Sequence, residues 1–167
     1  FIENNSEIDQ LRVIQANDEG SEVIRGEREG GAVIIASDID LQTKASRNYF
    51  KESVKSNKGE FYISSINLNR EYGKLEFPYK AVIRLSLPIL SDANERYGFI
   101  IMNVNARFLL DQMKQALAQN QSLYVTDNEG YFTLHPDSDK SFSKDLNPSI
   151  NWQSEFVQPL KAGRARL

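Results

Sequence analysis

Two arginines and several hydroxyl, amide and phenol side chains are the residues of this sequence that could hold a small molecule. They fall in four short stretches, at residues 47–50, 62–67, 84–86 and 103–105. The candidates are Arg47, Tyr49, Tyr62, Ser64, Asn67, Arg84, Ser86, Asn103 and Asn105. Polar and aromatic groups that converge on one concave surface are typical of small-molecule sites. The sequence therefore predicts a polar pocket, provided that the fold brings these stretches together.

The arginines indicate which ligand such a pocket would take. A guanidinium offers a planar pair of donors that can hold a carboxylate or a phosphate through two parallel hydrogen bonds. Either Arg47 or Arg84 could act in this way. The alternative is that both form ion pairs with Glu60, Glu71 or Glu76 and only join layers of the fold.

The sequence offers little for catalysis or metal binding. Its one histidine, His135, has no accompanying Gly-x-Ser-x-Gly motif, and the chain has no cysteine. This excludes disulfides, thiolate zinc sites, iron–sulfur clusters and cysteine nucleophiles. The carboxylate pairs Asp38/Asp40 and Asp137/Asp139 are more typical of helix caps and turns than of a metal site. We expect no catalytic residue, no metal and no cofactor.

The elements that must position the candidate residues alternate between strands and helices. Strand patterns cover residues 11–14, 21–25, 32–36, 61–68, 81–87 and 99–105, and another hairpin is expected at 123–134. Helical spacing begins at Leu41, with Asp40 as its predicted N-cap, and continues towards Gly59; a second amphipathic helix is predicted over 107–118. Side chains alternate across a strand, so Tyr62 and Ser64 share a face, as do Arg84 and Ser86. The order predicts an α+β fold with a largely antiparallel sheet.

Composition is that of an ordinary globular protein. Of its 167 residues, 40% are hydrophobic and 26% are charged, and the net charge is −3. An acidic chain without a basic face is not expected to bind nucleic acid. The longest apolar runs are far shorter than the ~20 residues that span a bilayer. Because the chain begins at Phe1 rather than at Met, we expect it to be a fragment.

A weak internal repeat suggests two modules. Residues 11–20 and 123–130 both read as a strand followed by a turn that ends in Asn-Glu-Gly-like residues, and their glycines are Gly20 and Gly130. The predicted division is a first module over residues 1–120, followed at 121–167 by the start of a second module or a docked tail.

Ordered short motifs resemble a known family. They are LQTKASRNYF at 41–50, GEFYISSINLN at 59–69, VIRLSLP at 82–88 and YGFIIMNVN at 97–105. Together with residues 9–25 and 123–146, they resemble double Cache domains, also called PDC or extracytoplasmic PAS-like sensors. The resemblance covers essentially the whole chain.

The resemblance implies a PAS-like core with a central antiparallel sheet of about five strands flanked by helices. It also implies the periplasmic, ligand-sensing part of a bacterial inner-membrane receptor, with a histidine kinase or a diguanylate cyclase as the output. Such a receptor is expected to be a homodimer, and to meet the membrane only through segments absent from this chain.

Three positions depart from the amino-acid-binding members of that family. Arg47 matches their carboxylate-binding Arg, but Gln42, Tyr49 and Asn103 stand where those members have Tyr, Trp and the ammonium-binding Asp. A neutral amide at Asn103 supplies no charge for an ammonium group. We therefore expect a small polar or anionic metabolite rather than an α-amino acid. The alternative function is a ligand-free structural or protein-interaction module whose input is a periplasmic partner.

Overall fold

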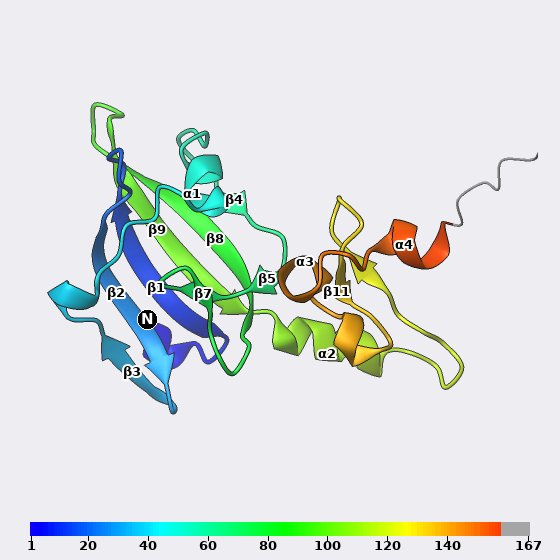
Figure 1. The fold of residues 1–167 in the computed structure, drawn as a ribbon. Helices are drawn as coiled ribbons and strands as arrows, with labels where there is room; N and C mark the ends of the chain where they lie inside the picture. The colour runs from blue at the N-terminus through cyan, green and yellow to red at the C-terminus, as the bar shows by residue number, and fades with distance from the viewer. Residues whose placement is uncertain (158–167) are drawn as a thin grey trace, which may run out of the picture. The chain divides into compact units, whose positions relative to one another are not determined.

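The computed structural model describes residues 1–157 of the chain, and its largest element is an antiparallel sheet (Figure 1). The four long strands of this sheet are β1 (Ile8–Gln15), β2 (Glu22–Glu29), β8 (Ala81–Leu90) and β9 (Arg96–Asn105). The edge strands are β3 (Ala32–Ile35), β4 (Tyr62–Ile63) and β5 (Asn67–Leu68). The strand order is β3-β2-β1-β9-β8-β4, and β5 also pairs with β8. The predicted α+β, antiparallel architecture is confirmed, with seven strands in place of about five.

The remaining elements are short. The first unit adds η1 (Ile2–Asn4), η2 (Asp38–Asp40), α1 (Asn48–Ser53) and the hairpin of β6 (Arg70–Glu71) and β7 (Lys74–Leu75), and α2 (Arg107–Gln115) follows β9. The second unit contains β10 (Val125–Thr126), β11 (Phe132–Leu134), η3 (Ser138–Lys140), α3 (Ser143–Leu146) and α4 (Trp152–Phe156). None of the helices within residues 1–157 is long and apolar enough to span a membrane.

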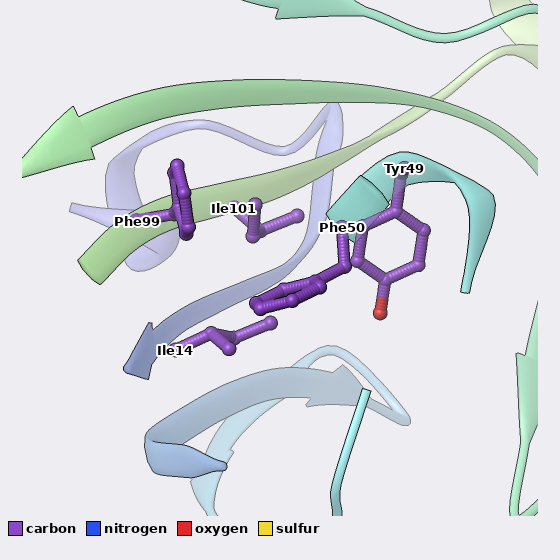
Figure 2. Packing of buried hydrophobic residues seen from close by; sticks show 5 residues of the cluster. All are labelled: Ile14, Tyr49, Phe50, Phe99 and Ile101. Atoms are coloured by element: carbon purple, nitrogen blue, oxygen red, sulfur yellow. The ribbon is translucent and has the colours of Figure 1, made fainter. Parts of the chain in front are cut away.

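The core lies where α1 packs on one face of the sheet. Phe50 and Tyr49 of α1 meet Ile14 of β1 and Phe99 and Ile101 of β9 (Figure 2). The rings of Phe50 and Phe99 pack edge to face, with centroids 5.7 Å apart. We refer to this covered side of the sheet as the inner face.

The helix predicted from Leu41 begins later, and Asp40 is not its N-cap. Residues 41–47 are not helical, because their backbone bonds to the β1–β2 hairpin: the N–H of Glu22 donates to the Gln42 carbonyl, and the N–H of Lys44 to the Gly20 carbonyl, both at 2.9 Å. Tertiary hydrogen bonds therefore override the helical spacing. Asp40 belongs to η2, and the N-cap of α1 is Arg47.

Gly20 lets this segment approach the hairpin closely. Its φ is +59°, a conformation that favours glycine. A Cβ there would lie 2.9 Å from the backbone nitrogen of Ala45 and 2.9 Å from the Phe50 ring. The predicted turn glycine thus allows residues 41–47 to pack beside β1 and β2.

Contacts within the chain separate two units, Phe1–Asp111 and Gln112–Leu167. The second unit has its own cluster of rings. The ring centroids of Phe132 and His135, in the hairpin region, lie 4.8 Å apart, and those of Trp152 and Phe156, in α4, lie 4.5 Å apart. A capping box at Asn151 begins α4. These rings pack against one another within the second unit, and residues 158–167 of the predicted second module or tail lie outside the described residues.

Candidate functional site

A row of polar residues crosses the inner face beside the aromatic core. Arg84 of β8 is directly opposite Asn103 of β9, Asn103 is opposite Gln10 of β1, and Gln10 is opposite Glu27 of β2. Directly opposed residues of antiparallel strands point to the same face. The guanidinium of Arg84 lies over the Tyr49 ring of α1, 5.2 Å from its centre, so this face is the one that α1 covers.

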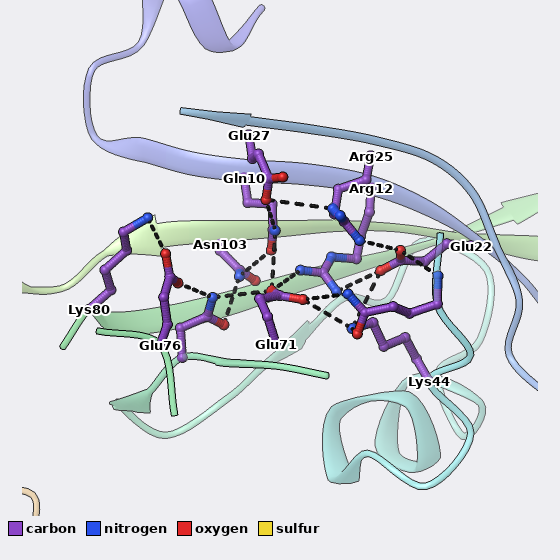
Figure 3. A network of polar contacts seen from close by, with 12 residues as sticks. Gln10, Arg12, Glu22, Arg25, Glu27, Lys44, Glu71, Glu76, Lys80 and Asn103 are labelled. Carbon is purple, nitrogen blue, oxygen red and sulfur yellow. Dashed lines mark hydrogen bonds and ion pairs between the residues drawn. The ribbon is translucent and has the colours of Figure 1, made fainter. Parts of the chain in front are cut away.

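Residues from two segments outside these strands complete the arrangement, which we call the polar cluster. Figure 3 shows the part of it around Glu22 and Glu71, together with the neighbouring Glu76 and Lys80. Residues 41–47 supply Gln42 and Lys44, and residues 67–71, from β5 to β6, supply two asparagines and a glutamate. The polar cluster consists of Gln10, Arg12, Glu22, Arg25, Glu27, Gln42, Lys44, Asn67, Asn69, Glu71, Arg84 and Asn103. Most members are buried, and charged groups are rarely buried without partners.

Within residues 1–157, Arg84 is the one cation of the cluster that forms no ion pair with a carboxylate. It is 3% exposed, and its guanidinium donates to Oδ1 of Asn67 at 2.5 Å and to Oδ1 of Asn69 at 2.8 Å. Burial, opposed by the Tyr49 hydroxyl and reinforced by the charge of Arg12, lowers the pKa of Arg84 to about 10. The group remains a cation at neutral pH.

Glu71 is the most extensively bonded carboxylate. Its Oε1 accepts from Gln10 at 3.2 Å, Arg12 at 3.1 Å and Asn69 at 3.2 Å, and its Oε2 accepts from Gln42 at 2.9 Å and Lys44 at 3.4 Å. Burial alone would raise its pKa, but Arg12 and Lys44 and the hydrogen bonds from the glutamines outweigh burial. They lower the pKa of Glu71 to about 2.

Several buried polar atoms beside these bonds make no hydrogen bond within the described residues. Three of them are Nε of Arg12, Oδ1 of Asn103 and Oγ of Ser86. A buried polar atom without a partner is costly, so each such atom needs a physical explanation. All three belong to residues of the inner face, and Ser86 and Asn103 were predicted site residues.

The structure brings most of the predicted residues to one region. Arg84, Asn67 and Asn103 belong to the polar cluster, and Tyr49 lies under Arg84. Tyr62 packs against the core cluster of Ile14, Tyr49, Phe50, Phe99 and Ile101.

Arg47, the N-cap of α1, is half-buried, and its side chain makes no hydrogen bond or ion pair within residues 1–157. It is close enough for its positive charge to lower the pKa values of Tyr49 and Arg84, although burial of the Tyr49 hydroxyl raises that group's pKa overall.

Two predicted residues have local bonding roles. The Ser64 hydroxyl accepts the backbone N–H of Arg84 at 2.9 Å and donates to the Ser65 carbonyl at 2.8 Å. Oδ1 of Asn105 accepts the backbone N–H of Arg107, the first residue of α2, at 2.9 Å. Ser64 therefore tethers the chain beside β8, and Asn105 lies at the far end of β9.

The alternative ion pairs of the arginines do not form among the described residues. Glu60 accepts hydrogen bonds from Asn57, Glu76 pairs with Lys80, and Glu71 pairs with Arg12 and Lys44. Neither Arg47 nor Arg84 pairs with any of the three carboxylates.

Gln10, Arg12 and Lys44 were not predicted as site residues, and Glu71 was expected only as an ion-pair partner of Arg47 or Arg84. Arg12 could have been found by the reasoning applied to Arg84, because it lies among apolar residues on an alternating strand and shares a face with Ile14. Lys44 and Glu71 lie outside the main sheet, and only the tertiary fold brings them to it.

An apolar groove lies on the opposite face of the sheet. It has a volume of about 470 Å³ and is lined in part by Leu11, Leu85, Leu87, Ile100 and Met102. These positions alternate with the inner-face residues. The groove is therefore separate from the polar cluster.

Comparison with known proteins identifies the family of this chain. The family model described as "Bacterial histidine kinase, sensor domain" matches residues 2–159. The chain belongs to this bacterial sensor-domain family. The search of curated proteins found no match.

Solved structures with the same fold are also sensory domains. The structure titled as a domain of a putative sensory box/GGDEF family protein from Vibrio parahaemolyticus is 19% identical, with a TM-score of 0.74 over 93% of this chain and 58% of the other. The extracellular domain of the putative histidine kinase vpHK1S-Z8 is 18% identical, with a TM-score of 0.71, and the match covers 93% of this chain and 55% of the other.

A third structure contains a ligand. The ligand-binding domain of the Campylobacter jejuni chemoreceptor Tlp3, in complex with L-norvaline, is 15% identical, with a TM-score of 0.55 over 91% of this chain and 55% of the other. The sensor domain described here thus spans little more than half the length of the structures that it matches. At these identities the likeness establishes the shared fold.

Proposed function

We propose that this sensor domain binds a small anionic metabolite at the polar cluster of its first unit, and that binding shifts a signalling conformation. The observation that carries the proposal is Arg84, a guanidinium buried under α1 whose only hydrogen-bond acceptors within residues 1–157 are two amide oxygens. A buried charge without an opposite charge is unfavourable, and an anionic ligand would supply that charge.

The surroundings of Arg84 support an anion over a cation. The cluster contains four cations and three carboxylates, which are Arg12, Arg25, Lys44 and Arg84 with Glu22, Glu27 and Glu71. Glu22 and Glu71 are each paired with two or more cations, so neither is free to bind an ammonium group. An α-amino acid would therefore bring a positive charge to a region that already has an excess of it.

The receptor context belongs to the same proposal. We infer that the domain is the periplasmic part of a bacterial inner-membrane receptor with a histidine kinase or diguanylate cyclase output, and that the full-length receptor is a homodimer. The family model supports the receptor class, and the matched structures include an extracellular domain of a histidine kinase and a periplasmic domain of a chemoreceptor. Ligand binding would shift the relative populations of two conformations of the domain.

A thermal-shift panel tests this function. The purified chain is heated with propionate, lactate, succinate or phosphate, and with L-valine and glycerol as controls, at constant ionic strength. An anion at 100 times its dissociation constant should stabilise the domain by about 2.7 kcal/mol. Stabilisation by a carboxylate or phosphate that is lost in Arg84→Lys supports the proposal, because an ammonium cannot reproduce the planar donor pair. If no anion stabilises the chain, the alternative of a protein-interaction module is favoured.

A further inference from the structure

The five donors around Glu71 form a complete binding site for a carboxylate group. We call it the carboxylate cradle, and it consists of Gln10, Arg12, Gln42, Lys44 and Asn69. Two of these groups are cationic and three are amides, and they contact both oxygens of the carboxylate. Hydrogen bonds to an ionised carboxylate are stronger than hydrogen bonds between neutral groups.

The cradle is held in place without Glu71. Arg12 is fixed by Glu22, whose Oε1 lies 2.8 Å from Nη1 of the arginine. The backbone N–H of Gln42 donates to the other Glu22 oxygen at 3.0 Å. The Lys44 backbone bonds to the β1–β2 turn. The site would therefore keep its shape if its carboxylate left.

Glu71 differs from Glu22 in how it reaches the cluster. The Glu22 side chain is 0% exposed and belongs to the main sheet, whereas the Glu71 side chain is 17% exposed and belongs to the separate β6–β7 hairpin. Each strand of that hairpin has two residues, and its turn residues Tyr72 and Gly73 have φ values of 51° and 76°. Two-stranded hairpins are marginally stable by themselves.

Tyr72, in the turn of the hairpin, also bonds to the 40–42 segment. The Tyr72 N–H donates to Oε1 of Gln42 at 3.1 Å, and its hydroxyl donates to the Asp40 carbonyl at 3.3 Å. Tyr72 is 63% exposed, so water competes for both bonds. Glu71 of this small hairpin thus makes more bonds to the polar cluster than Tyr72 does, in a site suited to a free carboxylate.

We propose that Glu71 is an internal occupant of the ligand's carboxylate subsite, and that a carboxylate ligand binds by displacing it and releasing the β6–β7 hairpin. This inference rests on the proposed function and adds to it the ligand class, the subsite and the segment that moves. Removal of Glu71 leaves Arg12 and Lys44 paired only through Glu22, so an incoming carboxylate restores the charge balance. Asn69 links the cradle to Arg84, so the rest of the ligand would extend toward that guanidinium.

Propionate tests the subsite, because it reproduces the end of a glutamate side chain. The melting temperature of Glu71→Ala is measured against sodium propionate, with propionamide and sodium chloride as controls at equal ionic strength. The proposal predicts a saturable increase with propionate alone, at a concentration roughly tenfold lower than wild type requires, because no internal carboxylate competes. Equal concentration dependence in the two proteins, or no response in Glu71→Ala, would overturn it.

Matched variants keep the test decisive. Glu76→Ala removes a neighbouring carboxylate that also bonds to Asn69 but lies outside the cradle, so it should require the same propionate concentration as wild type. Glu71→Ala combined with Lys44→Met should lose the response. If Glu71→Ala does not fold, Glu71→Gln is titrated in its place, and it too should bind propionate more tightly than wild type.

Hydrogen exchange of the wild-type protein tests the displacement itself. A saturating carboxylate from the thermal-shift panel should speed amide exchange at residues 70–76 while slowing it at β1 and β9. A carboxylate that binds and leaves exchange at 70–76 unchanged or slower overturns the displacement but leaves the proposed function standing. If no anion binds to wild type and Glu71→Ala still responds to propionate, the proposed function fails while the cradle remains a carboxylate site; displacement by a ligand is then contradicted.

Discussion

The guanidinium of Arg84 lies 5.2 Å from the centre of the Tyr49 ring, and the two residues come from the central sheet and from the helix that covers it. Both are more than nine-tenths buried. A cation over an aromatic face is attracted by the ring's quadrupole, and the attraction is stronger when the cation is desolvated. This contact is where the aromatic core of the inner face meets the polar cluster.

Loss of the Tyr49 ring should destabilise the first unit. We expect Tyr49→Leu to lower the free energy of unfolding by roughly 2–3 kcal/mol, because it removes both the packing and the cation–π contact. Tyr49→Phe keeps the ring and should stay within about 1 kcal/mol of wild type. Urea denaturation measures both variants, and equal losses in the two would show that the hydroxyl, not the ring, is the stabilising group.

Arg47 should matter for binding and not for folding. Its side chain caps no helix N–H and makes no ion pair within residues 1–157, so Arg47→Ala should change the free energy of unfolding by less than about 0.5 kcal/mol. Because its charge reaches the Arg84 site, the same change should weaken binding of a stabilising anion by roughly tenfold. Unchanged affinity in a calorimetric titration would remove Arg47 from the site.

Acid should destabilise the domain through Glu71. The pKa of this group is lowered from 4.5 to about 2 in the folded state. Its contribution to stability is therefore fully present above pH ~4.5 and is lost as the pH falls towards 2. The contribution is of order 3 kcal/mol, since each pKa unit corresponds to about 1.4 kcal/mol.

Glu71→Gln isolates that contribution. The glutamine variant should be less stable than wild type at pH 7, and the difference should shrink as the pH approaches 2. Urea denaturation at several pH values measures the two curves. A constant difference across this range would mean that ionisation of Glu71 does not stabilise the fold.

The two faces of the sheet should respond differently to truncation. Phe50 is 6% exposed and packs on Phe99, so Phe50→Ala should cost about 3–5 kcal/mol. Phe61 is 62% exposed at the groove side, and Phe61→Ala should cost less than about 1 kcal/mol. Thermal unfolding of Phe50→Ala and Phe61→Ala measures the two losses of stability. Similar losses in the two variants would contradict the assignment of the core to the inner face.

Sequence alone predicted the long strands because strand alternation is a local signal. The alternation around Arg84 placed that residue on the covered face, and buried and more exposed residues alternate along much of β1, β8 and β9. The helix expected from Leu41 was wrong because its backbone bonds to a hairpin 20 residues earlier in the chain, which periodicity does not reveal.

The part of the candidate site that lies on the long strands was predicted from the sequence, because the pattern of residues along a strand is a local signal. Arg84 and Asn103 stand out as polar residues within apolar strands, and the family resemblance pointed to the same stretches. Glu71 and Lys44 enter the cluster from irregular or short segments, 27 residues apart in the chain. Their proximity depends on how the hairpin and the 41–47 segment fold over the sheet, and no local pattern specifies it.

Calorimetric titration of wild type and Arg84→Lys with a small carboxylate measures whether the buried guanidinium binds an anion. We expect one saturable site per chain in wild type, and binding at least roughly tenfold weaker in Arg84→Lys, whose circular dichroism should match that of wild type. Absence of carboxylate binding in wild type, or equal affinity in the two proteins, would contradict this expectation.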